Sequence, residues 1–228
     1  MATPKKPRVL VAMTSHSTKG DSGERTGAYL PEIAHPYDVF ARAGFDVDFA
    51  SVAGGRVPLD GADGKDPLLA PFQPGGPLEG RLLDSLPASA VDPARYDAVF
   101  FAGGHGTMWD FADCEAFAKV AAAIHEKGGV VSAVCHGPAA LVNVKLSSGA
   151  WLVAGKTVSA FTNEEERAVK LDRVVPFLLE DKLVERGAVV ETAPTWQAKV
   201  VVDGRLVTGQ NPASAAAVAR EVARLLGA

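Results

Sequence analysis

The chain has 228 residues, a formal net charge of −4 and only two cysteines. A single α/β domain commonly reaches this length, so we expect one domain over residues 1–228, and the interleaved acidic and basic residues leave no basic patch that would bind a nucleic acid. No apolar run approaches the roughly 20 residues of a membrane span and the N-terminal apolar segment is too short for a signal peptide, so we expect a cytoplasmic protein that binds no membrane.

Five short runs rich in valine and phenylalanine predict β-strands. They are residues 8–13, 47–50, 98–102, 130–134 and 157–161. Several of these runs lack a regular alternation of apolar and polar residues, which is typical of strands that are covered on both faces. We therefore expect helices on both sides of the sheet that these strands form.

Stretches with apolar residues at helical spacing lie between and after the strands. They are residues 33–43, 115–127, 174–186 and 213–226. Strands that alternate with helices form βαβ units, in which a parallel sheet packs between two layers of helices. The predicted fold class is therefore α/β, a three-layer sandwich with a mostly parallel sheet.

Two segments depart from this alternation. Residues 54–93 are rich in glycine, proline and aspartate and have little periodicity, so they predict a long surface excursion that can overhang the functional site. Residues 199–208 contain two short β-runs joined by Asp203 and Gly204, which is a strong hairpin signal. We expect this hairpin to be a late, antiparallel addition to the sheet.

Three of the predicted strands end in polar or glycine-rich residues. The first ends in Thr-Ser-His at residues 14–16, the third in Gly-Gly-His-Gly at residues 103–106, and the fourth in Cys-His-Gly at residues 135–137. In an open parallel sheet, reactive groups gather at the carboxyl ends of the strands. We therefore expect these three segments to converge.

Cys135 lies between a predicted strand and a helix-compatible segment, as the nucleophile does in a nucleophile elbow. A helix that begins there would favour the thiolate through its dipole. The alternative is a buried packing residue, since free cysteine is among the most buried residue types. The strand–turn–helix context and the adjacent His136 favour the nucleophile.

The backbone N–H of Gly104 can complete an oxyanion hole with that of His136, because glycines let the backbone approach a ligand closely. The alternative is a tight turn that binds nothing. His105 is either a wall of this site or a solvent-facing residue of the turn. Glu32, which follows Pro31, is either an ordinary carboxylate in a first helical turn or a site residue.

The five histidines show no His-x-x-x-His spacing, and the two cysteines show no Cys-x-x-Cys spacing. These spacings are typical of metal ligands on one element. We therefore predict that the protein binds no metal. Two cysteines are also too few for a disulfide scaffold, so both thiols should be free.

Taken together, these segments resemble the ThiJ/PfpI superfamily, and within it the branch of small heat-induced chaperones and glyoxalases III. The resemblance covers nearly the whole chain, including the segments TGAYLPEIAHPYDVFARAGFDVDFAS, AGGHGTMWDF, AVCHGPAALV and GKTVSAFTNEEE. It implies a flavodoxin-like sandwich, a homodimer, and conversion of methylglyoxal to lactate without glutathione, metal or another cofactor. It also implies a chaperone activity on unfolded-protein clients.

The resemblance implies a role for each site residue. Cys135 is the nucleophile, His136 is its partner, and Glu32 is the acidic residue that touches the thiol. The third triad member lies in FTNEEE, where the residue count favours Glu166 over Glu165. The base that moves a proton from C1 towards C2 of the 2-oxoaldehyde is His136 or Glu32.

Two other classes of function stay open. One is a stress-protective chaperone in which Cys135 senses oxidants. The other is a cysteine amidase or peptidase, because cysteine, histidine and glutamate also compose a protease triad.

Overall fold

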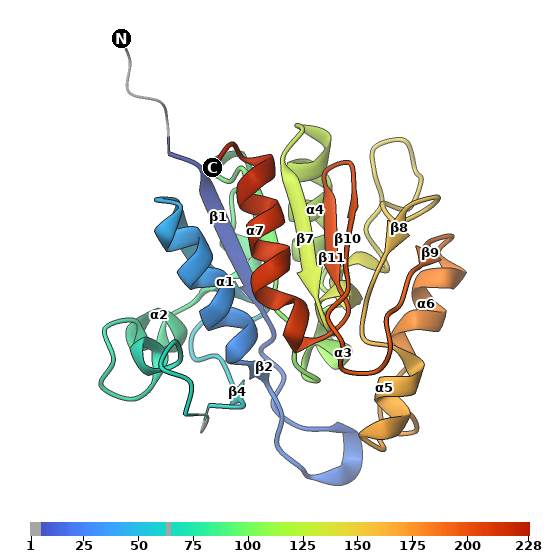
Figure 1. The fold of residues 1–228 in the computed structure, drawn as a ribbon, viewed down its shortest axis with the longest axis horizontal. Coiled ribbons are helices and arrows are strands. Elements are labelled where there is room, and N and C mark those ends of the chain that lie inside the picture. The colour runs from blue at the N-terminus through green and yellow to red at the C-terminus, as the bar shows by residue number, and fades with distance from the viewer. Residues whose placement is uncertain (1–5, 63–64) are drawn as a thin grey trace.

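The computed structural model describes residues 6–62 and 65–228. Seven strands within these residues form one sheet, in the order β10-β11-β7-β6-β1-β3-β5 (Figure 1). Their bounds are Arg8–Met13 (β1), Asp46–Ser51 (β3), Leu86–Pro87 (β5), Ala98–Phe101 (β6), Val130–Val134 (β7), Val200–Asp203 (β10) and Leu206–Gly209 (β11). All neighbouring strands are parallel except the β10–β11 hairpin, so the predicted α/β class with a late antiparallel addition is confirmed.

Helices cover both faces of this sheet. The helices are Pro31–Arg42 (α1), Glu79–Leu83 (α2), Thr107–Asp110 (α3), Glu115–Glu126 (α4), Asn163–Ala168 (α5), Leu179–Glu185 (α6) and Ala215–Leu225 (α7). In Figure 1, α1 and α7 lie in front of the sheet and α4 lies behind it. This is the three-layer arrangement that the alternating strands and helices predict.

The side chains of β1 show why both faces must be covered. Val9 and Val11 join the apolar cluster that includes Ile33 of α1, while Leu10 and Ala12 join the cluster that includes Phe117 of α4. Successive side chains of a strand point to opposite faces, so an uninterrupted apolar strand needs a layer on each side.

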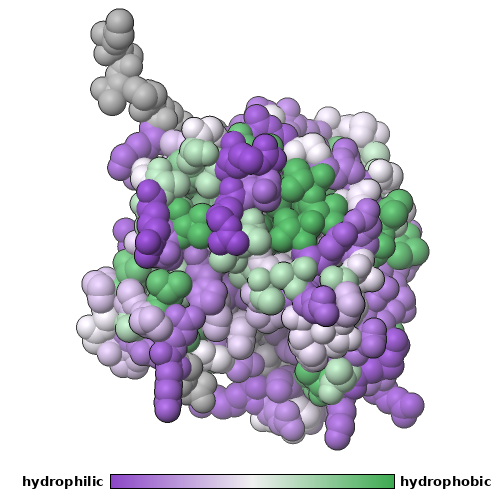
Figure 2. Space-filling model, in the orientation of Figure 1, coloured by the Kyte–Doolittle hydropathy of each residue, from purple (hydrophilic) through white to green (hydrophobic). Residues whose placement is uncertain are grey.

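The front face of the molecule carries hydrophilic side chains interspersed with small, separate groups of hydrophobic ones (Figure 2). None of the helices within residues 6–62 and 65–228 has the length and apolar character needed to cross a membrane.

Two elements differ from the expected ones. Of residues 157–161, only Thr157–Val158 (β8) forms a strand, and it pairs with Val189–Val190 (β9) outside the main sheet. β10 is the strand beside β11 at this edge of the sheet, and β8 contacts both strands of the hairpin without joining their ladder. The helix expected over residues 174–186 begins at Leu179, and Pro176 disfavours the helical conformation at the preceding Val175.

The described part of the excursion, residues 54–62 and 65–93, packs against the β3 edge and α1, and its last residues contact α4. Phe72 lies in the same apolar cluster as Ile33, and its ring contacts Tyr37 edge-on at a centroid distance of 5.3 Å. The excursion approaches the carboxyl edge of the sheet through Leu59–Asp60 (β4), which pairs with Ala28–Tyr29 (β2). The larger part of the excursion therefore lies at the β3 edge of the domain, and β4 approaches the functional site.

Candidate active site

The segments that follow β1, β6 and β7 meet at the lower end of the sheet in Figure 1. The Cα of Gly106 is so close to Thr14 that a Cβ there would lie 2.9 Å from the Thr14 methyl. A Cβ on Gly103 would lie 2.9 Å from the Cβ of Cys135. The convergence expected from the strand order is therefore confirmed.

Cys135 occupies a sharp turn between β7 and a 3₁₀ helix, Gly137–Leu141. Its φ is +59°, a left-handed conformation that non-glycine residues seldom adopt and that costs about 1–3 kcal/mol. Gly137 makes the turn feasible, since a Cβ there would lie 2.2 Å from the carbonyl oxygen of Phe101. The helix expected after the cysteine is this five-residue 3₁₀ turn, so the turn itself, and not a long helix dipole, sets the environment of the thiol.

Cys135, His136 and Glu166 form a hydrogen-bonded chain. The Sγ of Cys135 lies 3.3 Å from Nδ1 of His136, and Nε2 of His136 lies 2.8 Å from Oε2 of Glu166. His136 is completely buried and Glu166 nearly so. The structure thus brings together the three residues that the sequence singled out.

The protonation states follow from these contacts. Burial alone would raise the pKa of Glu166, but hydrogen bonds from His105 and His136 lower it to about 2. Burial and the neighbouring His105 lower the pKa of His136 to about 4. At neutral pH Glu166 is therefore a carboxylate that accepts the Nε2 proton of a neutral His136, which leaves the lone pair of Nδ1 facing the sulfur.

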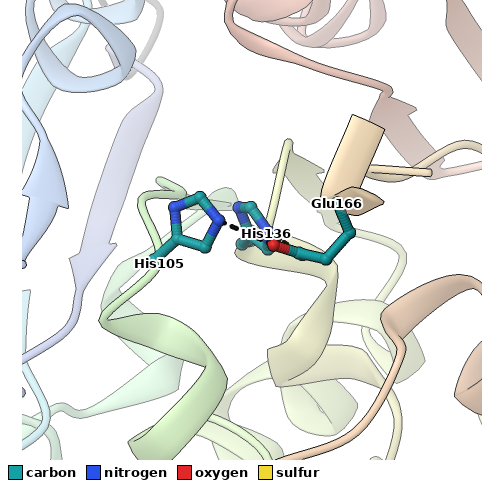
Figure 3. A group of neighbouring side chains, drawn as sticks. All are labelled: His105, His136 and Glu166. Carbon is teal, nitrogen blue, oxygen red and sulfur yellow. Dashed lines mark hydrogen bonds and ion pairs between the residues drawn. The ribbon is translucent and has the colours of Figure 1, made fainter. Parts of the chain in front are cut away.

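His105 binds the same carboxylate. Its Nε2 lies 2.9 Å from Oε1 of Glu166, and its ring centroid lies 4.1 Å from that of His136 (Figure 3). From the sequence, His105 is either a wall of the site or a residue of the turn, and no sequence pattern pairs it with Glu166. No local pattern could have revealed the pair, because the two residues are 61 positions apart.

Glu32 lies in the first turn of α1 and is completely buried. Its Oε2 accepts a hydrogen bond from the N–H of Gly103 at 2.9 Å, and its carboxyl interacts with the Cys135 thiol. Oε1 has no nitrogen or oxygen partner among the described residues. Burial raises the pKa of Glu32 to about 8, so this carboxyl is not the solvated first-turn carboxylate that was the alternative.

The thiol and the Glu32 carboxyl behave as one titrating pair. Burial, followed by the charge of Glu32, raises the pKa of Cys135, while the N–H groups of His136 and Gly104 lower it. Two buried anions in contact resist joint ionisation. The pair therefore loses its first proton as the pH rises through about 8, and the proton that remains lies on the sulfur or on the carboxyl.

The N–H groups of Gly104 and His136 both lower the pKa of this sulfur, which places them beside it. Gly104 has φ +102°, and a Cβ on it would lie 2.4 Å from the carbonyl oxygen of Gly27. Only glycine fits that backbone conformation and that close approach. Two converging N–H groups can hold an oxyanion that forms on a carbon bound to Sγ.

Glu165, the runner-up for the triad, faces away from His136. Its Oε1 accepts hydrogen bonds from the backbone N–H of Trp196 at 2.9 Å, the Gln210 amide at 3.0 Å and the Asn211 amide at 2.8 Å. Its Oε2 accepts from the N–H of Thr162 at 3.0 Å, which completes a capping box at the start of α5. Glu165 therefore fixes the helix turn that carries Glu166.

Residues that were not identified from the sequence also hold the site in place, through ring packing and hydrogen bonds. The ring of Phe161 packs on His136 with a centroid distance of 4.2 Å. The Thr107 hydroxyl donates to the carbonyls of Gly104, at 2.9 Å, and His136, at 3.1 Å, and so ties the two turns together. The Thr14 hydroxyl donates to Asp110 at 2.8 Å, so the end of β1 holds α3 and does not join the triad.

Residues 26–225 match the DJ-1/PfpI family. Glyoxalase 3 of Candida albicans (strain SC5314 / ATCC MYA-2876) is 34% identical over 228 residues, which cover 94% of this chain and 96% of that protein. The glutathione-independent glyoxalase HSP31 of Saccharomyces cerevisiae (strain ATCC 204508 / S288c) is 33% identical over 225 residues, which cover 91% of this chain and 93% of that protein.

Solved structures share the fold over almost the whole chain. The Rapid Encystment Protein 24 KDa of Francisella tularensis superposes with a TM-score of 0.94 at 39% identity and covers 97% of this chain and 100% of that one. Glyoxalase III of Candida albicans superposes with a TM-score of 0.87 at 32% identity and covers 96% of this chain and 97% of that one.

Proposed function

The chain belongs to the DJ-1/PfpI family, and on that premise we propose that it is a glutathione-independent glyoxalase that converts methylglyoxal and related 2-oxoaldehydes to 2-hydroxy acids such as lactate. One observation carries the proposal. The buried sulfur of Cys135 is in contact with a neutral imidazole, a carboxyl of raised pKa and two backbone N–H groups, and this set can supply every proton transfer of the reaction.

The first step is addition of the sulfur to the aldehyde. The thiolate form of Cys135, with the shared proton on Glu32, forms a bond to C1, and the oxygen on C1 becomes an oxyanion. The N–H groups of Gly104 and His136 hold this oxyanion. Transfer of the Glu32 proton to it gives a neutral hemithioacetal and leaves Glu32 as a carboxylate.

The second step is an internal oxidation and reduction. Carboxylate Glu32 removes the C1 proton to give an enediolate and returns it to C2, while the remaining hydroxyl proton moves from the C1 oxygen to the C2 oxygen. C1 is thereby oxidised to a thioester and C2 reduced to an alcohol, with no external redox partner. A pKa of about 8 suits this role, because an acid–base group works best when its pKa lies near the working pH.

The third step is hydrolysis of the thioester. His136 accepts a proton from water at Nδ1 while the water oxygen bonds to C1. The carbon–sulfur bond then breaks and the 2-hydroxy acid leaves, while the imidazolium returns its proton to Cys135 and Glu32, which again share one proton. Glu166 stabilises the imidazolium that forms for the duration of this step, as the carboxylate does in hydrolytic triads.

The burial of the nucleophile favours a small aldehyde over a peptide. Cys135 is only 4% exposed, and both His136 and Glu32 are 0% exposed. A peptide bond carries chain on both sides, so its carbonyl carbon cannot reach such a sulfur without large rearrangement. This argues against the amidase or peptidase alternative.

Five further properties belong to this proposal. The protein works in the cytoplasm as a homodimer of single-domain chains, it needs no cofactor, and it has a chaperone activity on unfolded-protein clients. The support is the sequence resemblance and the similarity to HSP31. Light scattering of the purified protein measures the assembly, and an aggregation assay with a denatured client measures the chaperone activity.

The deciding experiment is turnover of methylglyoxal by the purified protein without glutathione, with a metal chelator present and with the product identified as lactate. Cys135→Ala serves as the inactive control, and Cys114→Ala as the matched cysteine control. We expect lactate from the wild type and from Cys114→Ala only. Lactate formation by Cys135→Ala at the wild-type rate would overturn the assignment.

A further inference from the structure

We propose that His105, His136 and Glu166 form a binding site for a zinc ion, and that the bound ion inhibits the enzyme by occupying the nitrogen that the triad uses. The two Nε2 atoms face the two oxygens of one carboxylate, at 2.9 Å for His105 and 2.8 Å for His136 (Figure 3). Two imidazoles and one glutamate are the donor set of many open zinc sites, in which a fourth position stays free. The inhibition rests on the proposed function, whereas the binding does not.

The distances suit an ion after small movements. One donor atom from each of the three side chains lies within 4.8 Å of the other two. Zinc bonds to nitrogen and oxygen at about 2.0–2.2 Å, which places tetrahedral donors roughly 3.3 Å apart. Modest side-chain rotations therefore bring all three donors onto one ion. His105 provides the route of entry, because its side chain is 16% exposed while that of Glu166 is 4% exposed.

The ion replaces two hydrogen bonds without leaving a charge unpaired. It takes the lone pair of each Nε2, and each imidazole that binds it in this way carries its proton on Nδ1. Glu166 stays a carboxylate and now faces the cation. Its two oxygens lose the N–H donors and gain the ion in their place.

The same shift explains why the ion inhibits. With zinc on Nε2, His136 presents Nδ1–H to the Sγ of Cys135, 3.3 Å away. Metal-binding histidines commonly donate their second N–H to an acceptor, and the sulfur provides one here. Nδ1 then has no lone pair to accept the proton of the hydrolytic water, so the thioester cannot be resolved.

The spacing of histidines and cysteines along the sequence could not reveal this site. Its ligands come from the turn after β6, the elbow after β7 and the first turn of α5, and they are 30 and 61 positions apart along the chain. Metal ligands on one element repeat at short intervals, whereas these meet only through the tertiary fold. The prediction that the protein binds no metal is therefore replaced by this proposal.

The binding test uses cobalt(II) as a coloured probe that zinc displaces. It is done in the Cys114→Ser/Cys135→Ser double variant, so that no thiolate can hold the ion. We expect one equivalent of cobalt with the visible absorption of a tetrahedral site. Adding His105→Ala or Glu166→Gln should each raise the Kd at least tenfold. His35→Ala is the matched control and should leave the Kd unchanged, because that ring pairs with Asp66 elsewhere on the domain.

Two results would overturn the site: no saturable cobalt binding up to millimolar concentration, or a Kd that neither substitution changes. Inhibition is tested on the wild type, where zinc should stop lactate formation and excess chelator should restore it. Binding without inhibition would overturn the second half of the proposal. A protein that makes no lactate under chelator refutes the glyoxalase proposal instead, and the cobalt titration still decides the site.

Discussion

His136 donates from Nε2 to Oε2 of Glu166 at 2.8 Å, and this one bond directs the lone pair of Nδ1 at the sulfur of Cys135. An imidazole that rotated or carried its proton on the other nitrogen could not accept a proton there. The carboxylate therefore sets the tautomer of the histidine, and its pKa of about 2 keeps it charged throughout the working pH range.

We expect Glu166→Gln to lower kcat by several powers of ten, on the order of 10⁴-fold, because an amide can donate to Nε2 and so stabilise the wrong tautomer. Glu164→Gln is the matched control, since Glu164 is an exposed neighbour on the same helix. Its kcat should stay within twofold of the wild type. Steady-state lactate formation measures both, and equal rates in the two variants would remove Glu166 from the mechanism.

We expect Glu165→Gln to act mainly on stability. Its buried carboxylate accepts five hydrogen bonds from Thr162, Trp196, Gln210 and Asn211, and an amide cannot accept all of them. The free energy of unfolding should fall by about 2 kcal/mol or more, as for other buried hydrogen bonds to charged groups. Urea denaturation measures it. A variant as stable as the wild type would contradict the role of Glu165 in holding α5.

We expect Glu32→Gln to separate thiol reactivity from turnover. The amide donates a hydrogen bond to the sulfur and removes the carboxylate charge that raises the pKa of Cys135, so labelling by iodoacetamide should be as fast as in the wild type or faster. It cannot carry a proton between C1 and C2, so lactate formation should fall about 10²-fold or more.

Peptide mapping distinguishes Cys135 from Cys114, whose pKa is raised by burial and by Asp110. Parallel loss of labelling and turnover would mean that Glu32 acts only through the thiol. Full turnover in Glu32→Gln would exclude it as the base.

The raised pKa of Glu32 predicts that stability falls as the pH rises from about 4.5 to about 8. The folded state holds the Glu32 proton up to a pKa of about 8, whereas the unfolded state loses it near the ordinary pKa of a glutamate side chain, 4.5. This contribution is therefore fully present below pH 4.5 and is lost as the pH rises towards 8. Each pKa unit corresponds to about 1.4 kcal/mol.

Glu32→Gln should abolish this part of the pH dependence. The Tm of the variant minus the Tm of the wild type should therefore be larger at pH 9 than at pH 5. Thermal unfolding at the two pH values measures the difference. A constant difference between the two proteins would show that Glu32 titrates alike in both states.

We expect Gly104→Ala to lower kcat by about 10²–10³-fold, the usual effect of losing one oxyanion donor. An added Cβ would lie 2.4 Å from the carbonyl oxygen of Gly27, so the turn must shift its N–H away from the sulfur. Gly128→Ala is the matched control, because Gly128 also has a positive φ, +81°, but its Cβ would meet nothing within 4 Å. Gly128→Ala should lower the stability of the protein and leave its kcat unchanged. Equal kcat values for both variants would argue against an oxyanion role for Gly104.

The sequence by itself determined the architecture and the chemical centre. Apolar runs such as residues 8–13 and 130–134 predict buried parallel strands, because a strand without polar positions must be covered on both faces. Cys135 stood out because strand, cysteine and glycine at a turn form a local pattern, and local patterns can be read along the chain.

Only the tertiary structure decided which side chains meet. Glu165 and Glu166 are neighbours with the same chemistry, and the direction of α5 alone turns one towards Gln210 and the other towards His136. The pairing of His105 with Glu166, and the burial that raises the pKa of Glu32, likewise depend on segments distant along the chain. Propensity and spacing act over a few residues, whereas hydrogen-bond geometry and desolvation depend on packing from every direction, so these features had to come from the fold.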